Sequence, residues 1–134
     1  MLSPFPELFA FSWFAPAIIR LVLGIFFVRF GILKLRSGKS EKLTFFELAG
    51  FPRAHVFLLV SAWIEIAGGL MLIAGLYTQI AAIALSLLLL AAVFIKWRKP
   101  ELLKNDTEFY ILLAAATATL IISGAGAIAF DIPL

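Results

Sequence analysis

Long apolar runs alternate with short polar stretches along the whole chain. A helix needs about 20 mostly apolar residues to cross the hydrocarbon core of a bilayer. Four segments approach this length: residues 16–35, 56–75, 78–97 and 108–127. We therefore predict an all-α fold, an integral membrane four-helix bundle that forms a single domain over residues 1–134.

The composition supports a lipid environment. Hydrophobic residues make up 63% of the 134 residues, and the mean hydropathy is +1.10. A soluble domain is typically about 45–50% apolar even when glycine is counted. No basic region followed by a short apolar core and a small-residue cleavage site opens the chain, so we expect every apolar run to be retained. The lipid bilayer is the first partner that we predict.

The charges are unevenly distributed between the two sides of the predicted bundle. The side that carries both termini and the turn at 75–78 has only Glu7 and Asp131 outside the spans. The opposite loops, 36–55 and 98–107, carry seven basic residues: Arg36, Lys39, Lys42, Arg53, Arg98, Lys99 and Lys104. By the positive-inside rule, both loops lie in the cytoplasm and both termini are extracytoplasmic. We expect no nucleic-acid partner.

The first loop contains a candidate short interfacial helix, "TFFELAGFP", at residues 44–52. Thr44 and Glu47 have the spacing of a capping box, and Gly50 with Pro52 ends the segment. Its apolar side chains either embed in the headgroup layer or cover the bundle.

Two spans carry their polar residues on stripes rich in glycine, at steps of three and four residues. The first stripe is Arg20, Gly24, Phe27, Gly31 and Lys34, and the second is Ser61, Glu65, Gly68, Leu72 and Gly75. Small residues let two helix backbones approach closely in lipid, and intramembrane ionisable groups usually face a bundle interior. We therefore expect both stripes to face inward.

The remaining spans differ in polarity. The fourth span has a similar stripe: Glu108, Leu112, Ala115, Thr119, Ser123 and Gly126. In the third span, the stretch "IAAIALSLLLLAAVFI" at residues 80–95 has only Ser86 as a polar residue, and the span is predicted to form a mostly lipid-facing wall.

Glu65 lies near the predicted midplane of the bilayer. Arg20 is the cation that we expect nearest to it, and we expect Lys34 to pair with Glu108 and Arg20 with Asp131. Arg29 projects about 180° from the Arg20 stripe, so it either snorkels toward the headgroups or pairs inside. Glu65 itself has two interpretations: a ligand or proton-relay group, or a hydrogen bond that fixes helix packing.

The sequence resembles the DoxX family of small four-span bacterial membrane proteins. The similarity covers residues 16–131 and is carried by "RLVLGIFFVRFGILKL", "EIAGGLMLIAGLYTQIAA", a glutamate that opens the last span, and "GAGAIAFD". Its most specific element comprises Glu65, Gly68, Gly69, Gly75 and Thr78. Family members often have histidine before the glycine at position 31, where this chain has Phe30. Arg29 also stands where the family pattern predicts an apolar residue.

The resemblance implies a bacterial plasma (inner) membrane and an association with oxidoreductase systems near the quinone pool. A quinone needs an apolar slot, which Phe27, Phe30 and Trp63 can line, a donor such as Arg20 or Lys34, and a proton relay such as Glu65. The chain has no cysteine and one histidine, His55, so it lacks ligand sets for haem, iron–sulfur or copper and no metal is expected. Electrons would then come from a bound quinone, a flavin or a redox protein partner.

Two other functions remain open at the level of sequence. One is a non-catalytic membrane anchor or assembly partner for a redox protein, which binds through the basic loops. The other is a small-molecule or proton carrier with Glu65 as its coupling group. Four short spans without an internal repeat disfavour a monomeric carrier, although a homo-oligomer can enclose a path.

Overall fold

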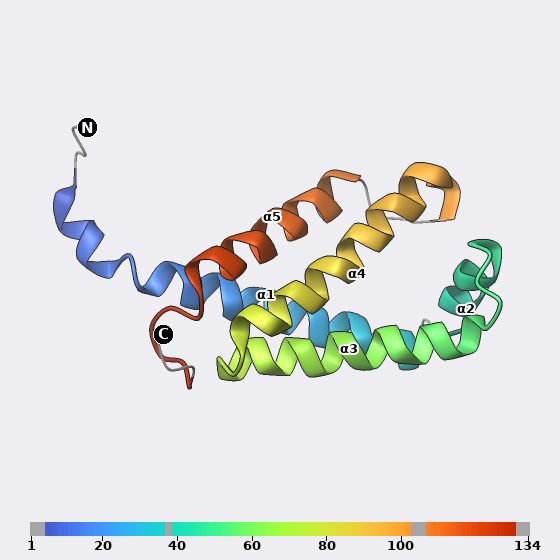
Figure 1. Cartoon of the computed structure of the whole chain (residues 1–134), viewed down its shortest axis with the longest axis horizontal. Helices are drawn as coiled ribbons and strands as arrows, with labels where there is room; N and C mark the ends of the chain where they lie inside the picture. The colour runs from blue at the N-terminus through green and yellow to red at the C-terminus, as the bar shows by residue number, and fades with distance from the viewer. Residues whose placement is uncertain (1–4, 37–38, 103–106, 131–134) are drawn as a thin grey trace.

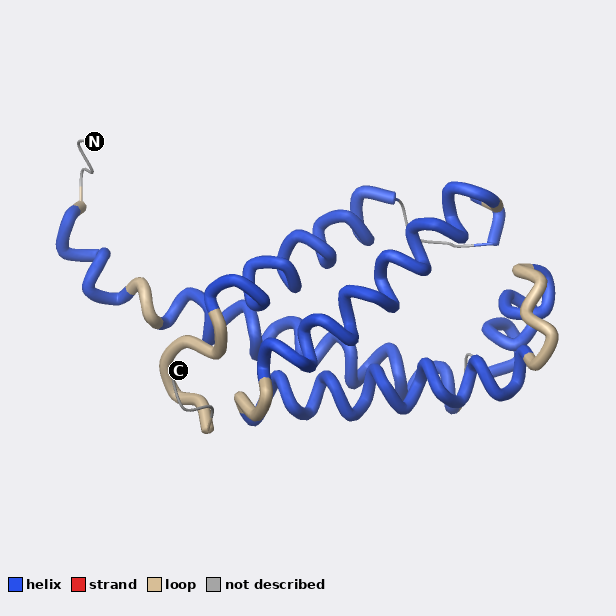
Figure 2. Tube along the Cα trace, in the orientation of Figure 1, coloured by secondary structure: helices blue, strands red, loops and turns tan. Residues whose placement is uncertain are grey.

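The computed structural model describes residues 5–36, 39–102 and 107–130, and all regular structure in these ranges is helical (Figures 1 and 2). The all-α prediction is confirmed. Five α-helices follow one another: α1 (Phe14–Leu35), α2 (Lys39–Leu48), α3 (Ala54–Ala74), α4 (Thr78–Arg98) and α5 (Thr107–Ser123). Two 3₁₀ turns, Pro6–Phe11 and Pro100–Leu102, precede α1 and follow α4.

The helices form two antiparallel pairs. The contact between α1 and α3 is the most extensive, and the contact between α4 and α5 is second. The turn between α3 and α4 joins the pairs, and α4 diverges from α3 with distance from that turn (Figure 1). We call the end with this turn, the start of α1 and the end of α5 the hairpin end. The other end, where α1 ends and α3 begins, is the loop end.

Backbone contact explains why α1 and α3 pack so closely. A Cβ atom added to Gly24 would lie 2.7 Å from the carbonyl oxygen of Gly69, and one added to Gly69 would lie 2.7 Å from that of Gly24. Seven residues further along α1, which is about two turns, a Cβ atom on Gly31 would lie 2.7 Å from the carbonyl oxygen of Ala62. Such separations leave no room for a larger side chain, as in other close helix pairs in lipid.

Gly68 differs from its neighbour Gly69. It is buried, but its added Cβ atom would meet the Leu85 side chain of α4 at 3.1 Å, not the backbone of α1. The stripe of α3 therefore contacts both neighbouring helices. Gly69 contacts α1, and Gly68 receives a side chain from α4.

Three helices, α1, α3 and α4, are long and apolar enough to cross a membrane, and α5 is a shorter apolar helix of 17 residues. At about 1.5 Å per residue, α5 is about 25 Å long, at the lower limit for a span. The predicted fourth span was too long, because the helix ends at Ser123. Gly124 and Gly126 follow with φ of 72° and 69°, left-handed conformations that glycine adopts without a steric penalty.

The face that α5 buries differs from the predicted stripe. Leu113, Thr117 and Leu120 are buried, whereas Glu108 and Leu112 are exposed. The prediction was wrong by one residue, which rotates the helix by about 100°. The third span also has a buried face, with Ala82 and Leu85 in the core, although α4 is the least buried of the three long helices.

The short helix α2 begins earlier than expected, at Lys39. Thr44 lies inside it and donates a hydrogen bond from Oγ1 to the Ser40 carbonyl oxygen, 3.0 Å away, so the predicted capping box is wrong. Phe46 packs against Ala54 and Leu58 of α3. The segment therefore covers the loop end of α3, in agreement with the second of the two interpretations.

Candidate functional site

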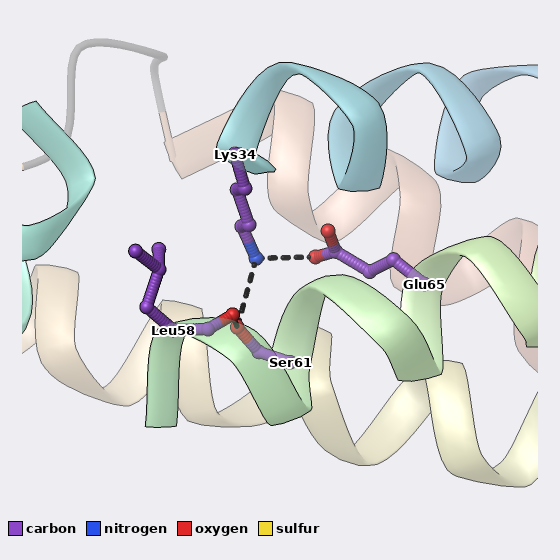
Figure 3. A network of polar contacts seen from close by, with 4 residues as sticks. All are labelled: Lys34, Leu58, Ser61 and Glu65. Carbon is purple, nitrogen blue, oxygen red and sulfur yellow. Dashed lines mark hydrogen bonds and ion pairs between the residues drawn. The ribbon is translucent and has the colours of Figure 1, made fainter. Parts of the chain in front are cut away.

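An ion pair between α1 and α3 is the most prominent polar feature among the described residues (Figure 3). Lys34 Nζ lies 2.6 Å from Glu65 Oε1 and donates a second, longer hydrogen bond of 3.5 Å to Ser61 Oγ. Ser61 Oγ in turn donates to the Leu58 carbonyl oxygen at 3.0 Å. The network therefore links the end of α1 to two successive turns of α3.

The ion pair is shielded from its surroundings. The side chains of Lys34 and Glu65 are 16% and 9% exposed, and Glu65 is the twelfth of the 21 residues of α3. A buried charge pair recovers its desolvation cost only with close geometry and further hydrogen bonds. The 2.6 Å contact and the Ser61 hydroxyl provide both.

The register of α1 against α3 brings these residues together. Gly31 packs beside Ala62 and Ile66, so Lys34, three residues later, lies beside Ser61 in the antiparallel helix. The lysine stem then extends about one turn along α3 to reach the carboxylate of Glu65. The same glycine contacts that fix the helix packing thus set the geometry of the ion pair.

The predicted pairing of Glu65 with Arg20 is wrong: the cation in contact with Glu65 is Lys34. Arg20 is level with Gly75, which it contacts closely. Ten residues of α3 separate Gly75 from Glu65, or about 15 Å. The buried Arg20 and the partly buried Lys34 therefore belong to opposite ends of the bundle.

Arg20 organises the segment that follows α5. It is 2% exposed, and its guanidinium donates to the carbonyl oxygens of Ile128 at 2.7 Å and Ala125 at 3.3 Å. The Ala127 amide donates to the Trp13 carbonyl oxygen at 2.9 Å. Backbone outside a helix is tolerated in a membrane only where its polar groups are satisfied. Arg20 supplies donors where the short helix α5 has already ended.

Other predicted pairs are absent or fall outside the described ranges. Glu108 is exposed and forms no ion pair with Lys34. Asp131, the expected partner of Arg20, lies outside the described residues. Arg29 is exposed on the opposite side of α1, consistent with the expectation that it projects away from Arg20.

An aromatic cluster links α1 to the start of α5, about one helical turn from Lys34. Phe30, one turn before Lys34, packs edge-on against Phe27 and Phe109, with ring centroids 6.3 and 6.2 Å apart. Trp63 does not join this cluster, because it is 60% exposed on the outer face of α3. Sequence reasoning missed Phe109. Phe109 directly follows Glu108 at the start of the predicted fourth span, and this position in the sequence indicates that it lies near the end of α1.

A second feature is a hollow of about 970 Å³ at the hairpin end. It lies between the start of α1, the α3–α4 turn and the segment after α5, and its lining includes Trp13, Tyr77 and Ser123. Gln79 bridges two of its walls by donating to the Ile121 carbonyl oxygen at 2.9 Å. Within the described ranges, no three His, Cys, Asp or Glu side chains are grouped to hold a metal ion.

These features define a small helical membrane protein with an ion pair inside its tightest helix pair. A family model, DoxX, matches residues 15–97, and the chain belongs to the DoxX family. The chain is also 28% identical over 115 residues to "Putative oxidoreductase CatD" of Bacillus subtilis (strain 168), covering 85% of this chain and 82% of that protein. No solved structure matches it.

Proposed function

We propose that the protein is the membrane subunit of an oxidoreductase system that acts at the quinone pool, and that the Lys34–Glu65 pair binds the quinone head group. The observation that carries this proposal is an ammonium–carboxylate pair, 2.6 Å apart and largely shielded, with an aromatic cluster about one turn away on α1. Membership of the DoxX family and the oxidoreductase name of a relative support it.

The chemistry of the pair suits a quinone. An ammonium group has three N–H donors, and the described contacts of Lys34 use two of them, to Glu65 and Ser61. The third donates to a quinone carbonyl oxygen and stabilises the negative charge that develops there on reduction. Phe30 and Phe109 provide an apolar edge for the ring.

The redox step requires an external electron donor. Reduction of a quinone to the quinol takes two electrons and two protons, and the proposed donor is a redox protein that is oxidised in the same step. Glu65 relays the protons to the quinone oxygens, because a carboxylate within hydrogen-bond reach serves as a general acid–base group. Burial of the Glu65 side chain, which is 9% exposed, keeps this carboxylate away from bulk water.

The loop end is the proposed docking surface for that donor. Arg36, Arg53 and Arg98 are exposed there. Lys99, directly after α4, donates to the carbonyl oxygen of Leu48 at the end of α2 and so links the two helices. We place this end in the cytoplasm of a bacterial plasma membrane, with both termini outside. A reporter that is active only in the cytoplasm, fused after Leu134, is expected to give no signal. Strong activity would reverse the orientation.

Binding of a short-chain quinone tests the proposed site. We would reconstitute the purified protein in lipid nanodiscs and titrate it with ubiquinone-1 and menadione, using calorimetry. The parent is expected to bind one of them saturably, and Glu65→Gln and Lys34→Met to weaken binding at least tenfold. Glu47→Gln is the matched control, because Glu47 is an exposed glutamate of α2 and should bind as the parent does.

Two outcomes would contradict the proposal. One is that neither quinone binds the parent, and the other is that Glu65→Gln binds as well as Glu47→Gln. The exposed basic residues of the loop end favour one alternative, a non-catalytic anchor for a redox protein. Retention of such a partner by the parent and by Glu65→Gln alike, without quinone binding, would favour that anchor.

A further inference from the structure

A groove on the outer face of α1 holds an arginine among aliphatic side chains. It has a volume of about 330 Å³ and is lined by Ile25, Val28, Arg29, Ile32 and Leu33 of α1 and Ile73 of α3. The groove opens on the side of α1 opposite the buried residues Phe27 and Gly31. In a membrane bundle this face contacts lipid.

Arg29 is a cation on the lipid-facing side of α1, and it lies well before the end of the helix. It lies six residues before Leu35, the end of α1, which is about 9 Å along the helix. Its side chain is exposed, and none of the described carboxylates forms an ion pair with it. A guanidinium at this depth therefore needs an anion from outside the described chain, since a bare charge in hydrocarbon is costly.

We propose that this groove binds an anionic phospholipid, with the phosphate on Arg29 and an acyl chain along the aliphatic walls. The charge complementarity is direct, because the planar guanidinium donates two parallel hydrogen bonds to a phosphate. The shape also fits: from Ile25 to Leu33 the groove follows α1 for about 12 Å, the direction in which an acyl chain runs. The long arginine stem reaches toward the headgroup layer at the loop end.

Ile73 makes the proposed site depend on the tertiary structure. It comes from α3, and Gly24 of α1 packs against it, so the two helices together form the wall farthest from the loop end. A bound acyl chain would contact both helices of the pair that holds Lys34 and Glu65. The lipid would then stabilise this pair, whether or not a quinone binds there.

Lipid binding to the purified protein tests the site. Delipidated protein in detergent would be titrated with phosphatidylglycerol and, separately, with phosphatidylcholine of the same acyl chains, and bound lipid counted by native mass spectrometry. The parent is expected to prefer phosphatidylglycerol about tenfold, and Arg29→Leu to lose that preference. Arg29→Lys keeps the charge but not the paired hydrogen bonds, and should be intermediate. Inorganic phosphate should not displace the lipid, because it lacks the acyl chain.

Arg53→Leu is the matched control, since Arg53 is an exposed arginine outside the groove. It should keep the preference for phosphatidylglycerol. An equal loss in Arg53→Leu would show general attraction of an anionic lipid to a basic protein and would overturn the site. So would displacement by inorganic phosphate. A change from dimer to monomer in Arg29→Leu, without a change in lipid preference, would assign the groove to a second copy of the chain and also overturn the proposal.

Discussion

Arg20 and Lys34 lie on the same stripe of α1, yet the structure gives them different partners. Arg20, at the hairpin end, donates to carbonyl oxygens of the segment after α5. Lys34, at the loop end, contacts the carboxylate of Glu65. A backbone carbonyl group is not an ionisable group, whereas a carboxylate is. The hairpin end therefore holds a structural cation, and the loop end holds a cation beside a group that can exchange protons.

The two ends also differ in what surrounds the cation. At the hairpin end, the backbone leaves the helix at Ser123, and Arg20 satisfies two of its carbonyl groups. At the loop end, α1 ends one residue after Lys34, but Lys34 donates to the side chains of Ser61 and Glu65 and not to backbone carbonyl groups. A charge pair that the backbone does not require is the better candidate for function.

Lys34→Met should have the largest effect on stability. It leaves the Glu65 carboxylate without its cation in a buried position, which costs about 3–5 kcal/mol when one partner of such a pair is removed. The free energy of unfolding, measured by titration with SDS in micelles, checks this value. The double variant Lys34→Met/Glu65→Leu should recover most of the loss, because no charge remains. An undiminished loss in the double variant would show that Lys34 acts through packing.

Arg20→Met should destabilise the protein by about 3 kcal/mol, through two hydrogen bonds from a charged donor. Amide hydrogen exchange should rise in residues 124–129 and remain unchanged in 58–66. Arg20→Lys should restore part of the stability, because it retains the charge and can reach one carbonyl group. Faster exchange around Glu65 instead would mean that the two ends are not independent.

Gly69→Ala should cost about 1–3 kcal/mol, because its methyl group meets the backbone of α1. Gly68→Ala is the matched control and should cost less than about 1 kcal/mol, since its methyl group meets a side chain, Leu85, that has to shift by only a few tenths of an ångström. Both are measured by the same unfolding titration. If Gly69→Ala weakens quinone binding as well, the glycine contact is confirmed as the support of the ion pair. Equal costs for the two variants would contradict the backbone contact.

Ser86→Ala should have the smallest effect, about 0.6 kcal/mol. It removes the 2.9 Å hydrogen bond from Ser86 Oγ to Thr117 Oγ1, which joins α4 to α5. Thr117 retains its contacts with the carbonyl oxygens of Leu113 and Ala114, so no buried hydroxyl is left unsatisfied. Quinone binding should be unchanged. A large loss of stability would show that the second helix pair depends on polar contacts as much as the first.

The sequence by itself determined the all-α membrane bundle, the approximate spans and the inward stripes of α1 and α3. The length of each apolar run and the spacing of glycines every three or four residues are local properties, and lipid leaves few alternatives to a helix. The stripes of Arg20 to Lys34 and Ser61 to Gly75 are largely buried as these patterns indicate.

Only the tertiary structure decided which cation meets Glu65 and which face α5 buries. Pairing depends on the register between helices and on the direction of a long side chain, and neither is a property of one segment. Packing of Gly31 beside Ala62 brings Lys34 to Glu65, while Arg20 turns toward Gly75 and the end of α5. The buried face of a helix is also sensitive to a small shift in the predicted stripe. A shift of one residue turns that face by about 100°, and in α5 this exposes Glu108 and buries Leu113.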